Sequence, residues 1–376
     1  MDHPGLALFD AFPDAARAIP HLALGCLPTP IQVHAGSEPG VDCAQLLIKR
    51  DDLSGERYGG NKIRKLEFLL AAARAGGARG VITFGVAGSN HALATSICAQ
   101  QYGLDSYSLL TRQANASYVR RNLLAGMWSG ANLFACESET AALTLSQRLA
   151  EEARAGGDTL YVIPGGGSSA IGCLGFVNAG FELAAQLRAN DIQPPDLIYL
   201  ALGTVGTAAG LQLGLRLAGL RSRLVPIRVV REDIGSPARF RSLLRGTGEL
   251  LGQACGIELS ADLDEVPPIR DEFIGPGYAR FTPDAIAAMK QAERRMGLCL
   301  DPTYTGKAFA ALLADLHSGA LRGRRVMFWN TYNSRPLPDA ALGADYHQLP
   351  VPFHWYFEQA VQALDPDVDA DADGAD

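Results

Sequence analysis

Short apolar segments alternate with amphipathic ones along most of the chain, and this alternation restricts the possible folds more than any other feature. Strands are predicted at residues 44–50, 81–85, 106–110, 131–135, 160–163, 197–202, 224–230 and 325–329. Helical periodicity is present at residues 90–102, 118–127, 140–155, 170–188, 207–218, 237–252, 283–295 and 307–316. Strands that alternate with helices form parallel sheets with helices on both faces. The chain is therefore predicted to be an α/β protein.

The glycine run at residues 165–167 interrupts this alternation and divides it into two parts. Two such parts predict a two-lobed, three-layer fold in which parallel-type sheets are covered by helices. A ligand site is expected in the crevice beyond the carboxyl ends of the strands. Residues 1–45 are predicted to be irregular, and residues 256–280 to be rich in loops. The acidic tail at residues 361–376 has almost nothing to bury and is predicted to be disordered.

The composition argues against several classes of protein. The chain of 376 residues has a net charge of −7, which gives no basic surface for nucleic acid. No apolar run is predicted to reach membrane-spanning length, and the N-terminus lacks the pattern of a signal peptide. The seven cysteines are dispersed and form no C-x-x-C motif, so neither a metal site nor a disulfide framework is predicted. A reducing, cytoplasmic setting fits these features.

The sequence GGNKIRKLEF at residues 59–68 places a lysine at the start of a helix. Two glycines and an asparagine form a turn, and apolar residues at helical spacing follow it. The positive end of the helix dipole disfavours the ammonium form of Lys62, and a lowered lysine pKa suits an amine that attacks a carbonyl group. On local grounds alone, a solvated lysine in a first turn is the simpler interpretation.

Three further turns, each after a predicted strand, consist of small residues: residues 85–91, 164–169 and 203–207. Each can present backbone N–H groups at the start of a helix, which is a ready anion site, although Ser89 and Ser169 can equally serve as N-caps. The last of these turns lacks the spacing of a Walker loop and of a dinucleotide fold, so a single phosphate is the better fit. A reactive lysine, a phosphate cradle and hydroxyl-rich loops together fit pyridoxal phosphate.

Six motifs in the chain resemble those of one known family. They lie in order between Leu27 and Thr331 and read GGNKIRKLEF, TFGVAGSNHALATS, IPGGGSSAIGCLGFVNAGFEL, ALGTVGTAAGL, GPGY and DPTYTGKAFAAL. Together they resemble the D-cysteine desulfhydrase and 1-aminocyclopropane-1-carboxylate deaminase family. Members of this family are fold-type II enzymes that use pyridoxal 5'-phosphate and are similar in architecture to the β subunit of tryptophan synthase.

The resemblance implies a role for each matching residue. Lys62 matches the lysine that binds the cofactor aldehyde, and Lys65 matches a lysine near the cofactor phosphate. Asn90 matches an asparagine that hydrogen-bonds the pyridoxal 3′-oxygen, and Ser89 matches a serine beside the substrate. The implied phosphate loop consists of Gly203, Thr204, Val205, Gly206 and Thr207. Two tyrosines around the ring and substrate complete the implied catalytic set, which is Lys62, Ser89, Tyr278 and Tyr304.

The same resemblance implies two domains and a homodimer. The larger, cofactor-binding domain is expected to comprise residues 1–64 together with 174–360. A smaller α/β domain is expected to be inserted at residues 65–173. The expected substrate is a small amino acid, whereas nucleic acid, a membrane and a metal ion are not expected as partners.

Two threonines favour one branch of the family. The deaminase branch has glutamate at the position of Thr305, and the desulfhydrase branch has threonine at the position of Thr331. A neutral hydroxyl would hold the pyridine nitrogen of the cofactor without protonating it, so the ring would withdraw electrons less strongly. This suits a good leaving group, because a thiol has a pKa of about 8.5 and water one of about 15.7. Elimination of sulfur from D-cysteine is therefore the main prediction.

Residues 330–334 depart from the family pattern and keep other activities open. The family usually has His-Thr-Gly-Gly there, whereas this chain has Asn-Thr-Tyr-Asn-Ser. The Ser-Asn-His motif also continues with Ala92-Leu93 instead of the arginine often found nearby. The alternatives are the ring-opening deaminase, a lyase or racemase for another β-substituted amino acid, and a cofactor-bound sensor or inactive paralogue. The base that removes the substrate proton (Lys62, Ser89 or a tyrosine) and the role of His91 also stay open.

Overall fold

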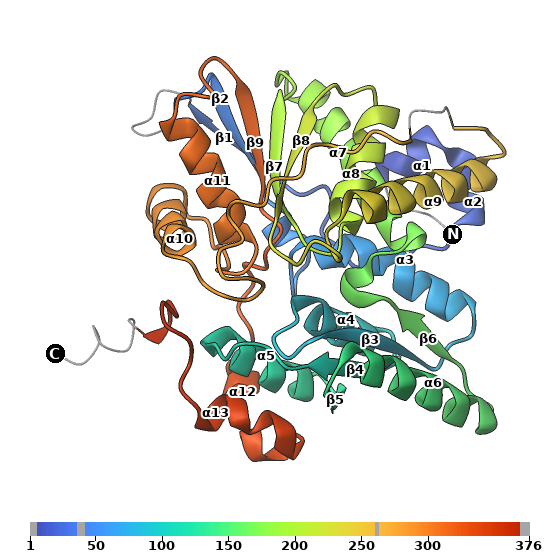
Figure 1. The fold of residues 1–376 in the computed structure, drawn as a ribbon. Helices are drawn as coiled ribbons and strands as arrows, with labels where there is room; N and C mark the ends of the chain where they lie inside the picture. Colours follow the sequence, from blue (N-terminus) through green and yellow to red (C-terminus); the bar gives the residue numbers. More distant parts are fainter. Residues whose placement is uncertain (1–5, 36–41, 260–262, 369–376) are drawn as a thin grey trace.

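Two largely parallel sheets, one in each lobe, form the framework of the protein (Figure 1). The computed structural model describes residues 6–35, 42–259 and 263–368. The sheet of the large lobe has the strand order β1 (Ile31–Ala35), β2 (Gln45–Lys49), β9 (Arg325–Trp329), β7 (Leu197–Leu202) and β8 (Arg223–Arg228). The sheet of the small lobe has the order β5 (Asn132–Cys136), β4 (Asp105–Thr111), β3 (Gly80–Val86) and β6 (Leu160–Ile163). The predicted strands are all present to within two residues, and the predicted α/β fold is confirmed.

Helices cover both faces of the large sheet. One face packs against α1 (Ala7–Ala11), α2 (Pro13–Ala18), α7 (Ala170–Ala189), α8 (Gly206–Leu217) and α9 (Pro237–Cys255), and the other against α10 (Pro283–Met296) and α11 (Thr305–His317). Successive side chains of a strand point to opposite faces of a sheet. Leu47 of β2 therefore belongs to the first core, whereas its neighbours Leu46 and Ile48 belong to the second.

The helix that carries the lysine lies between the lobes. The helices of the small lobe are α4 (Asn90–Gln101), α5 (Ser117–Trp128) and α6 (Glu139–Ala155). The lysine helix α3 (Asn61–Ala75) contributes side chains to a core of the large lobe and to the core of the small lobe. Phe68 of α3 packs into the large lobe, and Leu69 packs into the small one. The division into residues 1–64 with 174–360 and 65–173 remains a prediction, and both of its boundaries fall inside continuous helices, α3 and α7.

The N-terminal part of the chain is more regular than predicted. Residues 1–45 were expected to be irregular, but they contain α1, α2 and β1, and β1 pairs antiparallel with β2 in the otherwise parallel large sheet. These elements are short, and they are held by contacts with distant parts of the chain. The Leu8 N–H of α1, for example, donates to Asn178 Oδ1 of α7 at 3.0 Å. Two short late helices, α12 (Asp339–Leu342) and α13 (Trp355–Glu358), were not predicted either.

The prediction of a disordered tail was wrong for its first half. Residues 361–368 pack against the rest of the protein, and the Asp365 side chain there is buried. Its carboxylate accepts a hydrogen bond from the Ser117 N–H at 2.7 Å. Composition alone missed this order because the segment is held by polar contacts to other elements instead of by apolar burial. Residues 369–376 lie outside the described residues.

One helix, α7, is as long and apolar as a membrane span, which contradicts the expectation that no segment reaches that length. However, 72% of its apolar window is buried inside the protein, where it packs against α3, α8 and α9. A helix in the core of a folded domain passes the same test of length and composition. Within residues 6–35, 42–259 and 263–368, no other helix meets it.

Candidate active site

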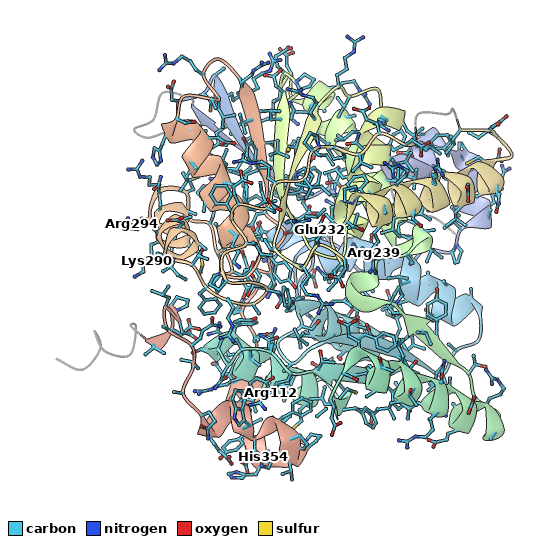
Figure 2. The ribbon with its side chains drawn as sticks, viewed as in Figure 1. Arg112, Glu232, Arg239, Lys290, Arg294 and His354 are labelled. Atoms are coloured by element: carbon cyan, nitrogen blue, oxygen red, sulfur yellow. The ribbon has the colours of Figure 1, made fainter. Side chains whose placement is uncertain are left out.

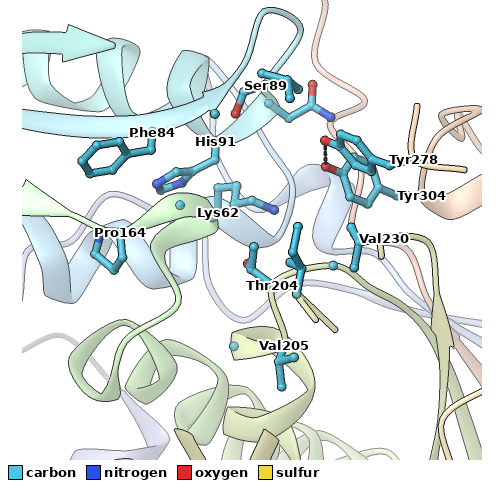
Figure 3. Close-up of a pocket in the computed structure, with 18 of the residues that line it drawn as sticks. Lys62, Phe84, Ser89, His91, Pro164, Thr204, Val205, Val230, Tyr278 and Tyr304 are labelled. Atoms are coloured by element: carbon cyan, nitrogen blue, oxygen red, sulfur yellow. Dashed lines mark hydrogen bonds between the residues drawn. The ribbon is translucent and has the colours of Figure 1, made fainter. Parts of the chain in front are cut away.

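A cavity of about 1180 Å³ opens between the two lobes (Figure 3). All three small-residue turns reach it, and each follows the carboxyl end of a strand: β3, β6 or β7. The cavity therefore lies where parallel strands of both lobes end, as predicted. Figure 3 shows the Lys62 amine near the centre, between His91, Thr204 and the pair formed by Tyr278 and Tyr304.

The turn before Lys62 depends on a glycine. Gly60 has a φ of 88°, and a Cβ atom there would lie 2.8 Å from the carbonyl oxygen of Thr331. The Asn61 N–H donates to that same carbonyl at 3.1 Å, which fixes the start of α3 to the end of β9. The Asn61 side chain then connects the lysine to the third turn, because its Oδ1 accepts from Lys62 Nζ at 2.8 Å and its Nδ2 donates to Thr207 Oγ1 at 2.9 Å.

The Lys62 amine has the lowered pKa that the sequence predicted, but for a different main reason. Burial is the largest cause, the positive charge of Lys65 is the next, and together they lower its pKa from 10.5 to about 7. The helix start, which the sequence interpretation emphasised, is not the main cause. An amine with a pKa of about 7 is about half uncharged at neutral pH, whereas an ordinary lysine is almost fully protonated there, and a carbonyl-binding lysine reacts in the uncharged form.

This lowered pKa predicts how the cofactor-free protein responds to pH. The rate at which it binds added pyridoxal phosphate should rise as the pH passes through about 7, because only the uncharged Lys62 amine attacks the aldehyde. A Lys65→Gln variant should shift this rise to higher pH, because the positive charge of Lys65 lowers the pKa of Lys62. Stopped-flow absorbance of the bound cofactor measures both rates. A rise centred near 10 in the wild type would contradict the assignment.

The third turn forms a cradle at the start of α8. Val205 is its N-cap with a φ of 73°, and no side chain of the turn caps the helix, which leaves helix-start N–H groups for an anion. The Thr204 hydroxyl lies 2.7 Å from the Ser168 hydroxyl of the second turn. Lys65 Nζ donates to Ser168 Oγ at 3.3 Å and to the Gly166 carbonyl at 3.0 Å. Lys65 is thus connected to the cradle through one residue, Ser168, and burial lowers the pKa of Lys65 to about 8.

The first turn offers a donor for the ring oxygen of the cofactor. Asn90 Oδ1 accepts hydrogen bonds from Asn122 Nδ2 at 3.0 Å and from the Tyr58 hydroxyl at 3.4 Å. Its oxygen is therefore engaged, and no described residue accepts from its two amide hydrogens. Ser89 is the N-cap of α4 and accepts from the Ala92 N–H at 3.1 Å, so it has the structural role that the sequence left open while it also lines the cavity.

The two ring nitrogens of His91, at the wall of the cavity, have no hydrogen-bond partner in the described residues, and a ligand could supply one. Both nitrogens are buried, and burial lowers the pKa of this imidazole well below its usual range. A neutral histidine at the wall of the cavity can accept one hydrogen bond at one ring nitrogen and donate one from the other. Together with the amine of Lys62, the α8 cradle and the amide of Asn90, this group fits a ligand with an aldehyde, a phosphate and a polar ring, which is pyridoxal phosphate.

Two tyrosines, Tyr278 and Tyr304, face each other on the side of Lys62 away from His91 (Figure 3). The hydroxyls of Tyr278 and Tyr304 lie 2.5 Å apart, and their rings meet edge to face with centroids 5.9 Å apart. Burial raises the pKa of Tyr278 to about 12 despite the hydrogen bond from Tyr304, and burial together with Tyr278 raises the pKa of Tyr304 well above its usual value. Both hydroxyls therefore keep their protons at neutral pH and can act as hydrogen-bond donors.

The two threonines expected at the cofactor ring lie in different places. Thr331, just beyond β9, lines the cavity. Thr305 does not: it is completely buried, and its hydroxyl donates to Asp301 Oδ1 at 2.7 Å while it accepts from the Asp301 N–H at 2.8 Å. The expected direct contact of Thr305 with the cofactor is therefore not supported, because the start of α11 turns this side chain toward Asp301. Any role of Thr305 acts through Asp301.

Asp301 and Ser168 are the main site residues that the sequence interpretation missed. The Asp301 carboxylate lines the cavity and accepts hydrogen bonds from the backbone of Thr303, Tyr304 and Thr305 and from the Thr305 hydroxyl. Burial raises its pKa, and these four donors oppose the rise. The spacing of aspartate and threonine around the start of a helix could have signalled this capping. Ser168 lies in the second small-residue turn, but its contact with Thr204 could not be predicted, because the two residues are far apart in the sequence.

The fold and the cavity define a class of enzyme. A lysine at the start of a helix between two α/β lobes, with a helix-start phosphate cradle opposite, is the arrangement of fold-type II pyridoxal-phosphate enzymes. The family model described as "Pyridoxal-phosphate dependent enzyme" matches residues 22–331. The chain therefore belongs to this family, and its cofactor is pyridoxal 5'-phosphate.

Relatives within the family are similar over most of their length. A protein of Pyrococcus horikoshii, provisionally named as a 1-aminocyclopropane-1-carboxylate deaminase, is 36% identical over 307 residues, which cover 81% of this chain and 88% of that protein. The D-cysteine desulfhydrase of Klebsiella pneumoniae is 33% identical over 305 residues, covering 78% and 88%. The crystal structure of an "ACC deaminase homologue" superposes with a TM-score of 0.74 at 32% identity and covers 88% of this chain and 95% of the other. The resemblance seen in the six motifs is confirmed.

Proposed function

We propose that the protein is a lyase that eliminates the β-substituent of a small amino acid, with D-cysteine as the favoured substrate. Pyruvate, sulfide and ammonia would be the products. The observation that carries this proposal is the polarity of the cavity at the end of β9. Thr331, which lines the cavity there, carries a neutral hydroxyl, and the carboxylate of Asp301, another lining residue, already accepts four hydrogen bonds, so neither is suited to protonate the cofactor ring. A weakly electron-withdrawing ring favours a substrate with a good leaving group such as a thiolate.

Different residues are proposed to bind the substrate carboxylate and to remove the α-proton. When bound, pyridoxal phosphate draws electrons from the α-carbon of the amino acid and so acidifies its α-proton. The N–H groups at the start of α4 are placed to bind the substrate carboxylate. Lys62 Nζ, uncharged above a pH of about 7, is the proposed base for the α-proton, and the hydroxyl of Ser89, which lines the same cavity, is the alternative.

The hydroxyls of Tyr278 and Tyr304 are proposed to donate a hydrogen bond to the sulfur that leaves the substrate. The pKa of Tyr278 is about 12, well above that of a thiol at about 8.5, so the pair can donate a hydrogen bond to a thiolate without losing its proton. A neutral donor of this kind stabilises charge that develops on the sulfur in the transition state. Tyr278 and Tyr304 are therefore assigned to the leaving group.

A panel of amino acids tests the proposed substrate. Purified holoenzyme should release pyruvate and sulfide from D-cysteine at least about tenfold faster than it releases pyruvate from D-serine, because hydroxide is a much poorer leaving group than thiolate. L-cysteine, L-serine, 3-chloro-D-alanine and 1-aminocyclopropane-1-carboxylate complete the panel. Keto acid from the cyclopropane substrate, with none from D-cysteine, would replace the desulfhydrase proposal by the deaminase one. A shift of the cofactor absorbance without any product would favour the sensor.

We further propose that the protein is a cytoplasmic homodimer. Support for the location comes from the seven cysteines, all of which are free thiols in the structure. Support for the dimer comes from apolar side chains left on the surface, such as Trp128 at 48% exposure and Val33 at 49%. Light scattering coupled to gel filtration tests the dimer, and cell fractionation tests the location.

A further inference from the structure

The last described part of the chain, residues 356–368, is named here the C-terminal strap. It leaves α13 at the small lobe, passes α5 and reaches the side of the large lobe on which α10 lies (Figure 1). Just before it, the guanidinium of Arg112 stacks on the Trp355 ring at 4.0 Å, and Figure 2 shows Arg112 and His354 together on the small lobe. The amide of Asn115 then donates to three carbonyls of the strap, those of Tyr356 at 3.0 Å, Gln359 at 2.8 Å and Ala360 at 3.2 Å.

The strap is also bonded to the start of α5. The N-cap of α5, Ala116, offers no side-chain cap. Asp365 of the strap supplies one, because its carboxylate accepts from the Ser117 N–H at 2.7 Å. One turn further on, Arg121 pairs with Asp367 at 2.5 Å. The strap is therefore fixed along the first part of α5, which belongs to the small lobe.

Gln362 of the strap is bonded to both lobes at once. Its backbone N–H donates to the Asn115 carbonyl of the small lobe at 3.0 Å. Its side chain holds the segment that leads into α10 of the large lobe: Nε2 donates to the Ala279 carbonyl at 3.0 Å, and Oε1 accepts from the Phe281 N–H at 3.1 Å. These two bonds enclose the residues directly after Tyr278.

The backbone next to Tyr278 needs such support. Ala279, directly after Tyr278, has a φ of 57°, in the left-handed region that a residue with a Cβ atom rarely adopts, and Gly277, directly before Tyr278, has a φ of 139°. Conformations of this kind persist only where surrounding contacts enforce them. Lys307 holds the segment from the other side, because its Nζ donates to the carbonyls of Ile274 at 2.7 Å and Gly277 at 3.1 Å. Gln362 supplies the hydrogen bonds that follow the strained residue.

We propose that Gln362 is a positioning residue, which holds Tyr278 against Tyr304 and makes this arrangement depend on the place of the small lobe. A displacement of α5 relative to the large lobe moves the Asn115 carbonyl and with it Gln362. The side chain of Gln362 transmits this movement to Ala279 and Phe281, and so to the tyrosine between the lobes. The tyrosine pair is thus completed only when the lobes have the relative position seen here.

The test compares two glutamines of the strap in the holoenzyme. Gln362→Ala removes both side-chain hydrogen bonds, whereas Gln359→Ala truncates an exposed side chain of the same segment and serves as the control. Gln362→Ala should speed amide hydrogen exchange in residues 274–282 and lower kcat about tenfold, with the absorbance of the bound cofactor unchanged. Gln359→Ala should match the wild type. Equal exchange and equal kcat in the two variants would overturn the proposal.

A double-mutant cycle separates positioning from a general structural effect. If Gln362 acts through Tyr278, the double variant with Tyr278→Phe should turn over no more slowly than Tyr278→Phe alone. Fully additive losses would overturn the proposal. If Gln362→Ala does not fold, Gln362→Glu replaces it, because glutamate keeps the acceptor for the Phe281 N–H and loses the donor to the Ala279 carbonyl. Amide exchange in residues 274–282 should then rise by an intermediate amount, and an unchanged exchange rate would overturn the proposal. The inference rests on the role proposed for Tyr278, but exchange is measured without substrate and so does not depend on which amino acid is turned over.

Discussion

Replacing Lys62 with alanine should lower turnover at least about 10⁴-fold and remove the visible absorbance of the lysine-bound cofactor. Both losses have one cause, because the same amine is proposed to bind the aldehyde and to act as the base. The amine is already prepared for this chemistry, since burial and the charge of Lys65 lower its pKa to about 7. Asn61 fixes it, because Asn61 Oδ1 accepts from Lys62 Nζ while its amide is bonded to Thr207. Absorbance spectra and a keto-acid assay measure the two losses.

Two other lysines provide the controls. Lys65→Ala should weaken cofactor binding yet retain the visible absorbance at saturating cofactor, because Lys65 contacts the cradle through Ser168 and does not hold the aldehyde. Lys290, exposed on α10 far from the cavity (Figure 2), should tolerate alanine without loss. If Lys62→Ala kept the absorbance and Lys65→Ala lost it, the assignment of the two lysines would have to be exchanged.

The sequence was sufficient for the parts of the fold that depend on local pattern. The strands at 160–163, 197–202 and 325–329 begin and end where the apolar runs predicted, because each is a short, mainly apolar segment bounded by proline, glycine or polar residues. The edge strand β1 was missed although Ile31 and Val33 alternate with polar residues, because a run of five residues is a weak signal and β1 is held mainly by pairing with β2. The strap was missed for a similar reason: its acidic composition predicts disorder, but its order comes from hydrogen bonds to residues such as Asn115, more than 200 positions earlier.

The same limit applies to the site. Motifs located the turns that carry Lys62, Asn90 and the cradle, since each turn is a local structure after a strand. They did not predict side-chain direction, and Thr305 shows the consequence. Its position next to Tyr304 in the sequence suggested the cofactor ring, but the first turn of α11 directs it to Asp301 instead. Side chains on consecutive helical residues point about 100° apart, so a motif alone could not place both at the ring.

Four buried charged side chains, one of them on the lysine helix α3, are expected to contribute strongly to the stability of the protein. Arg64, two residues after Lys62, donates to Asp51 at 2.8 Å and to Glu182 at 2.8 Å, and Lys49 Nζ donates to Glu182 at 2.5 Å. All four side chains are almost completely buried. Burial raises the pKa of Glu182, but the charges and hydrogen bonds of Arg64 and Lys49 outweigh it and bring the pKa down to about 2. The Asp51 carbonyl accepts from the Gly60 N–H at 2.8 Å, so this group also fixes the turn that presents Lys62.

Replacing Glu182 with glutamine or alanine should therefore lower the free energy of unfolding by about 3–5 kcal/mol, because it leaves Arg64 and Lys49 buried with only one carboxylate between them. The matched control is Glu152→Ala, which removes an exposed partner of Arg148 and should cost about 0.5 kcal/mol or less. Urea unfolding at neutral pH measures both.

The dependence of the unfolding free energy on acid pH tests the same carboxylate, Glu182, independently. The folded-state pKa of Glu182 is depressed from 4.5 to about 2, so its contribution is fully present above about pH 4.5 and is lost as the pH falls through about 2. This difference corresponds to about 3 kcal/mol of stability in the wild type. The variant Glu182→Gln has no carboxyl group to protonate there, so its unfolding free energy should fall less steeply over this range. Parallel pH curves for the two proteins would show that the carboxylate of Glu182 does not hold the lysine helix in place.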